Sequence, residues 1–281
     1  MDTIVLHTDL SRCQTITTRL TQLGYNTIFL TAPHPIEGTP YTVARQSDYE
    51  PGDLERSWWT TDDEAGSHPN LSLVIATLRD AIKQHGPFAG ALGFSQGGCA
   101  AASLAAMLEP SRRQSNPVRS LLGDDALSLQ APLELLILFS ANPYRFPLSS
   151  SNDTDVRFMF YPASFTSYPY SKDDMPMAET IALLSRKSSS VYADSYPMSI
   201  TTPNDNTIST PTLAFYGQKE WDLDPFSRRR QQWFISRFTD VQVQAHPWKH
   251  TVPRTDEYAK VVGKFVKRVE GRRKKPAKAS L

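Results

Sequence analysis

Short apolar runs alternate along the chain with stretches of helical periodicity. The runs are bounded by turn residues and predict buried strands over residues 3–7, 25–30, 88–92, 133–139 and 211–217. Residues 241–245 alternate apolar and polar side chains, which predicts a last, half-buried strand. The pattern therefore predicts a sheet of several short strands.

Between these runs, apolar residues recur at helical spacing over residues 12–23, 70–85 and 258–269. In the first of these stretches Ile16 and Leu20 share one face, and Gly24 follows at a C-cap position. Strands that alternate with helices are typical of a mainly parallel sheet with helices on both faces. The fold class predicted is α/β.

Two long segments interrupt this alternation. Residues 32–69 are rich in Pro, Gly, acidic and aromatic residues, and residues 141–210 are rich in Ser, Pro and Tyr. Both leave the side of the sheet where strands end, which is where open α/β sheets bind ligands. We expect these insertions to form pocket walls or a lid, with Trp58 and Trp59 beside the substrate.

Composition and charge narrow the class of protein. Thirty basic and 29 acidic residues give a net charge of +1, so no overall field favours nucleic acid or an anionic membrane. No apolar run approaches the roughly 18 residues of a membrane span, and the first residues do not resemble a secretory leader. Cys13 and Cys99 fall on separate predicted helices, as expected of reduced thiols in a cytoplasmic protein.

The length of 281 residues is compatible with one α/β domain that carries loop insertions. We expect this domain to cover residues 1–270. Residues 271–281 are basic and offer no apolar face for packing, so they predict a disordered, solvated tail and not a nucleic-acid contact. The oligomeric state is left open.

The segment with the clearest chemistry is Gly-Phe-Ser-Gln-Gly at residues 93–97, between an apolar run and a run of small residues. It predicts a nucleophile elbow, in which a strand turns sharply into a helix and exposes the serine at the apex. The flanking glycines let the two backbones approach. The helix that follows directs its first backbone amides at the site of reaction. Ser95 is thus the predicted nucleophile, with the amide of Gln96 in the oxyanion hole.

An elbow serine requires an acid and then a histidine after later strands. Glu220 and Asp222 follow the predicted strand at 211–217, and His250 follows the last strand. His250 is therefore the predicted base, with Glu220 as the acid and Asp222 as its rival.

A second histidine, His246, precedes His250 by four residues, the spacing of a helical zinc pair. Pro247 disfavours a continuous helix there, and the sequence has no His-Glu-x-x-His motif. We therefore expect neither a metal nor another cofactor.

With these residues assembled, most of the chain resembles the fungal serine hydrolase (FSH) family of α/β-hydrolases. The likeness rests on Gly-Pro-Phe-Ala-Gly-Ala-Leu-Gly-Phe-Ser-Gln-Gly at 86–97, Trp58-Trp59, Asp62-Asp63, Tyr216-Gly217, His246-Pro247 and His250-Thr251-Val252-Pro253. The resemblance implies an α/β-hydrolase fold, hydrolysis of an ester or thioester through an acyl-enzyme, and Phe94 at the substrate pocket. Many members release polyketide acyl chains in fungal secondary-metabolite biosynthesis. The implied partner is therefore a small-molecule acyl substrate, in one version presented by an acyl carrier protein.

The chain departs from the family at two positions. Thr8, followed by Asp9, stands where relatives have a glycine in the loop whose backbone helps to build the oxyanion hole. Glu220 stands where relatives have Asp, and Asp222 takes its place if the turn is longer. Because the loop at Thr8 is altered, a non-hydrolytic protein of the same fold, either a binding protein or a cyclase, is the alternative.

Overall fold

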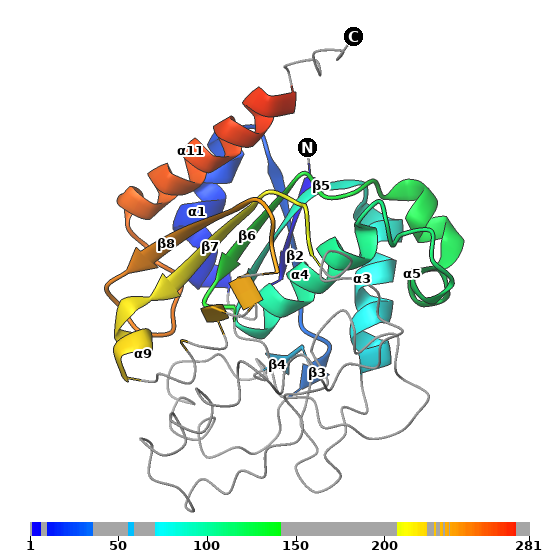
Figure 1. Ribbon diagram of the computed structural model, residues 1–281, viewed down its shortest axis with the longest axis horizontal. Helices are drawn as coiled ribbons and strands as arrows, with labels where there is room; N and C mark the ends of the chain where they lie inside the picture. Colours follow the sequence, from blue (N-terminus) through cyan, green and yellow to red (C-terminus); the bar gives the residue numbers. More distant parts are fainter. Residues whose placement is uncertain are drawn as a thin grey trace, which may run out of the picture.

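A central sheet of six parallel strands organises the protein (Figure 1). The computed structural model describes residues 2–6, 10–35, 56–58, 71–141, 207–223, 228, 231–232, 234–235 and 237–273. The strand order is β2-β1-β5-β6-β7-β8. The strands are β1 (Asp2–Leu6), β2 (Asn26–Leu30), β5 (Phe88–Phe94), β6 (Leu135–Phe139), β7 (Thr212–Gly217) and β8 (Val241–His246). These are the six strands that the apolar runs predict, with ends that differ by up to two residues.

The order in which strands are added reverses between β1 and β5. The chain first adds β2 on one side of β1, and then adds β5, β6, β7 and β8 in turn on the opposite side. In open α/β sheets the crevice outside the carboxyl ends of the strands at such a point is the usual ligand site. Leu6, the last residue of β1, lies in register with Gly93, near the end of β5. The fold thus places the predicted elbow at the switch point.

Helices cover both faces of the sheet (Figure 1). On one face α1 (Leu10–Gln22) packs against α11 (Asp256–Arg273), and their buried side chains join one hydrophobic cluster with β6 and β7. On the other face lie α3 (Leu71–His85), α4 (Gln96–Leu108) and α5 (Asn116–Leu129). This arrangement of a parallel sheet with helices on both faces is the α/β architecture that the sequence predicts.

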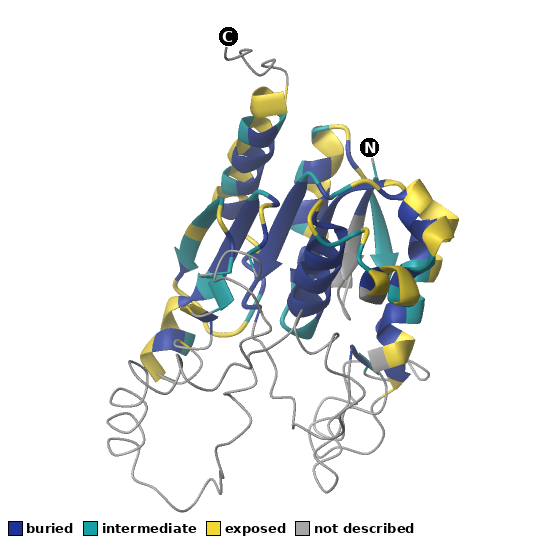
Figure 2. Cartoon of the chain, turned by 45° about the vertical axis from the view of Figure 1, so that its right-hand side comes forward, coloured by how far each residue is buried: buried dark blue, intermediate teal, exposed yellow. Residues whose placement is uncertain are grey.

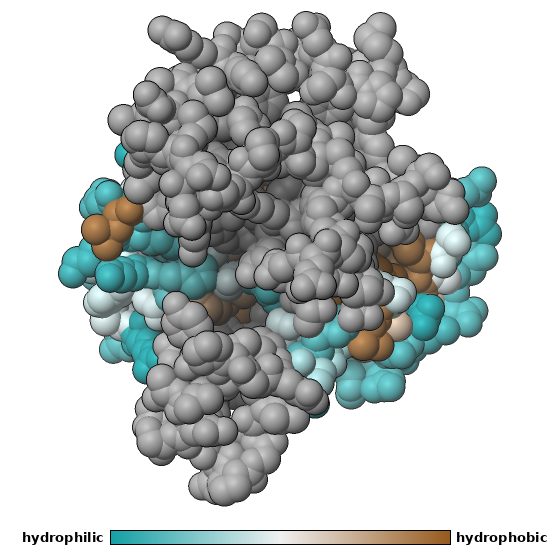
Figure 3. Space-filling model, turned by 90° about the horizontal axis from the view of Figure 1, so that it is seen from below, coloured by the Kyte–Doolittle hydropathy of each residue, from teal (hydrophilic) through white to brown (hydrophobic). Residues whose placement is uncertain are grey.

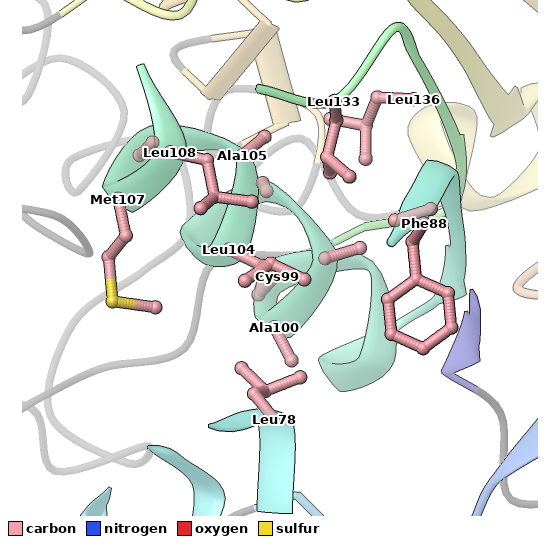
Figure 4. Close-up of a cluster of buried hydrophobic side chains, with 14 of the residues drawn as sticks. Leu78, Phe88, Cys99, Ala100, Leu104, Ala105, Met107, Leu108, Leu133 and Leu136 are labelled. Carbon is pink, nitrogen blue, oxygen red and sulfur yellow. The ribbon is translucent and has the colours of Figure 1, made fainter. Parts of the chain in front are cut away.

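The helix α4 is buried along nearly its whole length. Every residue from Gly97 to Leu108 is buried, and Figure 2 shows nearly all of the helix in the buried colour, while its first residue, Gln96, is of intermediate burial. A helix that is apolar all round is buried on every side, and small side chains let it lie close to the sheet. Figure 4 shows Ala100 of α4 and Leu78 of α3 pointing toward one another. The helix that begins directly after Ser95 is therefore held rigidly on the sheet.

Helix α5 and the end of α11 differ from the sequence-based prediction. The pattern does not predict α5, because Gly123, with φ 78°, interrupts its helical backbone and its periodicity. The last helix continues through Arg273, three residues into the range expected to be a disordered tail. Its final turn is held by ion pairs from Arg272 to Asp240 and from Arg273 to Glu134. Residues 274–281 lie outside the described residues.

The two insertions are described only in part. Within the first, β3 (His34–Pro35) pairs with β4 (Arg56–Ser57) in a short antiparallel hairpin. Residues 36–55, 59–70 and 142–206 lie outside the described part, so the pocket walls or lid expected there stay predictions. Figure 3 views the molecule from the side on which this hairpin and the short helix α9 (Gln218–Leu223) lie, and apolar as well as polar described residues are visible there. None of the described helices is both long and apolar enough to cross a membrane.

Candidate active site

The turn between β5 and α4 has the backbone geometry of a nucleophile elbow. Ser95 adopts φ 53° and ψ −120°, a conformation that side-chain-bearing residues rarely take and that is typical of functional sites. Its amide donates to the carbonyl of Phe139 on β6 at 3.0 Å, which fixes the turn to the sheet. A Cβ atom on Gly93 would lie 2.3 Å from the carbonyl oxygen of Gly97. Glycine at position 93 is therefore required for the strand and the helix to meet so closely.

His250 lies in the loop after β8 and reaches the serine. Its Nε2 is 2.9 Å from the Oγ of Ser95. The close approach depends on Gly217, where a Cβ atom would lie 2.3 Å from the carbonyl oxygen of Lys249 and 2.6 Å from that of Trp248. The histidine ring also contacts the ring of Phe94, with centroids 4.9 Å apart. The loop that carries His250 is thus packed on the ends of β5 and β7.

The third member of the cluster is Glu220, in the first turn of the short helix α9 (Gln218–Leu223). Its Oε1 lies 3.0 Å from the Nδ1 of His250. Asp222 on the same helix instead accepts a hydrogen bond from Gln218 at 2.9 Å. The structure therefore brings Glu220, and not Asp222, to the histidine.

Two residues that the sequence analysis did not single out support Glu220. Gln231 donates from Nε2 to the Oε1 of Glu220 at 3.2 Å and accepts from the Nε1 of Trp221 at 2.5 Å. Gln231 sits in a run of Arg and Gln residues with no apolar period, so the sequence carries no signal for this role. Only the tertiary contact identifies it.

His246 at the end of β8 lies behind the site and is 1% exposed. Burial is the main cause that lowers its pKa to about 4; the positive charge that His250 carries when protonated lowers it further, and the negative charge of Glu220 opposes the shift. Its ring packs among Trp248 and Tyr258. His246 is therefore a neutral core residue near neutral pH and adds no charge to the site.

The other predicted site residues are placed as follows. Gln96 is the first residue of α4, so its backbone amide lies at the N-terminus of that helix, directly after Ser95. Its side-chain Oε1 accepts from the backbone amide of Trp58 at 2.8 Å, while the Trp58 side chain, 1% exposed, belongs to the core. Trp58 is thus tied to the elbow through its backbone, and its expected role beside the substrate stays a prediction. Thr8, Asp9 and Trp59 lie outside the described residues.

Among the residues that the structure describes, no group of three or more His, Cys, Asp or Glu side chains is arranged to hold a metal ion. Cys13 and Cys99 are both buried and form no disulfide.

A strained serine at a strand-to-helix turn, followed in the chain by an acid and a histidine that meet it in space, defines the α/β-hydrolase class of serine hydrolases. The chain belongs to the serine hydrolase (FSH1) family, whose profile matches residues 10–262. This finding confirms the resemblance that the sequence motifs indicate.

Curated relatives carry hydrolase and esterase names. An uncharacterized hydrolase of Schizosaccharomyces pombe is 28% identical over 184 residues, which cover 58% of this chain and 43% of the relative. The esterase OVCA2 of Homo sapiens is 32% identical over 92 residues, covering 28% of this chain and 40% of the relative. The chain thus spans less than half the length of these relatives.

Two solved structures match most of this chain at low identity and low TM-score. A carboxylesterase from Mesorhizobium loti superimposes with a TM-score of 0.45 and 14% identity, covering 95% of this chain and 88% of the other. A thioesterase from the prodiginine pathway of Streptomyces coelicolor gives a TM-score of 0.44 and 14% identity, with coverage of 94% and 89%.

Proposed function

We propose that this protein is a serine hydrolase that cleaves an ester or thioester by forming an acyl-enzyme on Ser95. The observation that carries the proposal is the continuous hydrogen-bonded series from Ser95 Oγ to His250 Nε2, at 2.9 Å, and from His250 Nδ1 to Glu220 Oε1, at 3.0 Å. An isolated serine hydroxyl is a weak nucleophile, and an adjacent base held by an acid is the arrangement that activates it.

The proposed mechanism gives each of these three groups a role. Because a carboxylate only accepts hydrogen bonds, Glu220 fixes the tautomer of His250 with the proton on Nδ1, which leaves Nε2 free to accept the proton of Ser95. The serine oxygen attacks the acyl carbonyl, and His250 then donates the proton to the leaving group. In the second step His250 activates water, which hydrolyses the acyl-enzyme and restores the serine.

The oxyanion of the tetrahedral intermediate needs donors next to the elbow. The Gln96 amide, at the start of the rigid helix α4, supplies the first. For the second we propose the backbone of the turn at Thr8 and Asp9. The support is the register of β1 on β5, which pairs Leu6 with Gly93 and so ends β1 beside the elbow.

The acyl donor is the finer part of the proposal. A thiolate leaves with less need of protonation than an alkoxide, so Ser95 and His250 serve esters and thioesters alike. The esterase names of the relatives make esters the first class to test. As a further step we propose a polyketide-type acyl chain of fungal secondary metabolism, presented by an acyl carrier protein, on the basis of the family resemblance.

The test is covalent labelling with a fluorophosphonate probe, followed by intact mass measurement. The native chain should gain one probe adduct, and Ser95→Ala should gain none. His250→Ala should be labelled at least about a hundredfold more slowly, since the serine then lacks its base. The matched control is Ser103→Ala on α4, whose hydroxyl donates to the carbonyl of Cys99 and lies away from the reaction. Native protein that folds but stays unlabelled would refute the proposal.

A further inference from the structure

A buried polar side chain lies directly behind the proposed acid. Gln231 is 2% exposed and Trp221 is 8% exposed, although both carry polar groups. The Nε1 of Trp221 donates to Gln231 Oε1 at 2.5 Å, and Gln231 Nε2 donates to Glu220 Oε1 at 3.2 Å. These bonds extend the series of Ser95, His250 and Glu220 by two further members.

The chemistry of Trp221 decides which way the amide of Gln231 points. An indole nitrogen is only a donor, so the atom of Gln231 that faces it is the carbonyl oxygen. The amide nitrogen is then left to face the carboxylate, which is only an acceptor. The indole itself is fixed, because its ring stacks on Tyr216 with centroids 3.5 Å apart and an interplanar angle of 11°. The orientation of the amide is therefore set by its surroundings.

Glu220 depends on this donor. Its side chain is 11% exposed, against 38% for His250, so water has little access to hydrogen-bond with the carboxylate. Both hydrogen bonds from described residues, those from His250 and Gln231, reach Oε1, while the buried Oε2 has no partner among the described residues. A glutamate also has one more rotatable side-chain bond than an aspartate. Without Gln231, the only hydrogen-bond partner left to the carboxylate among the described residues is His250, whose side chain is 38% exposed.

We propose that Gln231 is a positioning residue, which holds the carboxylate of Glu220 in place for His250 in the orientation that Trp221 imposes. The proposal rests on the proposed function, since Glu220 needs positioning only if Ser95 and His250 react. Gln231 does not touch the reacting atoms and acts through Glu220 alone. Its removal should therefore slow the chemical step and leave substrate binding unchanged.

The experiment compares kcat and KM for a short-chain p-nitrophenyl ester. Gln231→Met keeps the length of the side chain and removes both hydrogen bonds, and it should lower kcat about tenfold to a hundredfold with KM unchanged. Trp221→Phe keeps an aromatic ring on Tyr216 but frees the amide to rotate, and should lower kcat about threefold to tenfold. The matched control is Gln218→Met, which removes a bond to Asp222 on α9 and should stay within about twofold of the native kcat.

A double-mutant cycle separates positioning from a general structural effect. In a Glu220→Ala background, Gln231→Met should cause no further loss of kcat, because the group it positions is gone. Circular dichroism and thermal melts check that each variant folds. If Gln231→Met does not fold, the same cycle is measured with Trp221→Phe in its place. An equal loss of kcat in both backgrounds, or a change confined to KM, would overturn the inference while leaving the hydrolase proposal intact. Native protein without probe labelling would overturn both.

Discussion

The substitution Gly217→Ala should lower kcat, although the atoms nearest to the added Cβ belong to Trp248 and Lys249 and not to the three proposed catalytic side chains. It should act by displacing the loop that carries His250. A Cβ atom there would lie 2.3 Å from the carbonyl oxygen of Lys249, whereas carbon–oxygen contacts in proteins lie at about 3.3 to 3.6 Å. The loop must therefore retreat by about 1 Å, and His250 is its next residue. Because a displacement of about 1 Å at reacting groups costs up to about a hundredfold in rate, Gly217→Ala should lower kcat by that factor.

The assay is ester turnover together with the rate of fluorophosphonate labelling, and both should fall by the same factor. Overpacking at this position should also reduce the free energy of unfolding by about 1 to 3 kcal/mol. Gly271→Ala in α11 is the matched control, since no atom lies within 4 Å of its added Cβ. This control should keep native kcat and gain up to about 1 kcal/mol of stability. A Gly217→Ala variant with native kcat would refute the reasoning.

Three further predictions follow from other contacts. Glu220→Ala should lower kcat by about a thousandfold to ten-thousandfold, while Asp222→Ala should stay near the native value, and equal effects on ester turnover would contradict the assignment of the acid. Glu109 is 5% exposed at the end of α4 and accepts hydrogen bonds from the backbone and hydroxyl groups of residues 209 and 210. Glu109→Ala should therefore reduce the free energy of unfolding in urea by about 3 kcal/mol and leave kcat unchanged, and a loss below about 0.5 kcal/mol would contradict this. For His246 the folded pKa of about 4 lies below the ordinary 6.5, so the unfolded chain binds more protons between these values and stability falls as the pH drops through that window. Between pH 7 and pH 4 the native chain should lose about 3 kcal/mol more than His246→Leu, measured by urea unfolding at both pH values, and equal losses would show that His246 is not the cause.

The sequence predicts the layers of the fold well because its signals are local. Each apolar run is bounded by turn residues, and the six strands appear where those runs lie. The elbow at residues 93–97 is likewise a local pattern, because Gly93 meets the backbone of Gly97 within the same turn. By contrast, the pattern does not predict α5, because Gly123 interrupts its helical periodicity. The helix forms nevertheless, since packing against α3 stabilises it. The last turn of α11 exceeds the predicted range because its ion-pair partners, Asp240 and Glu134, are distant in the chain.

At the candidate site the sequence by itself determined the types of residue and their order: a serine on an elbow, then acids, then a histidine. It left Glu220 and Asp222 as rivals, because two residues of one short helix differ only in direction, and direction depends on how α9 packs on β7. No sequence pattern predicts the role of Gln231, because its amide stands in a polar run. Its role follows only from its hydrogen bonds to the buried indole of Trp221 and to the carboxylate of Glu220. Local patterns fix strands, turns and candidate chemistry. The tertiary structure alone decides which distant side chains meet, because that choice depends on packing between segments that the sequence keeps apart.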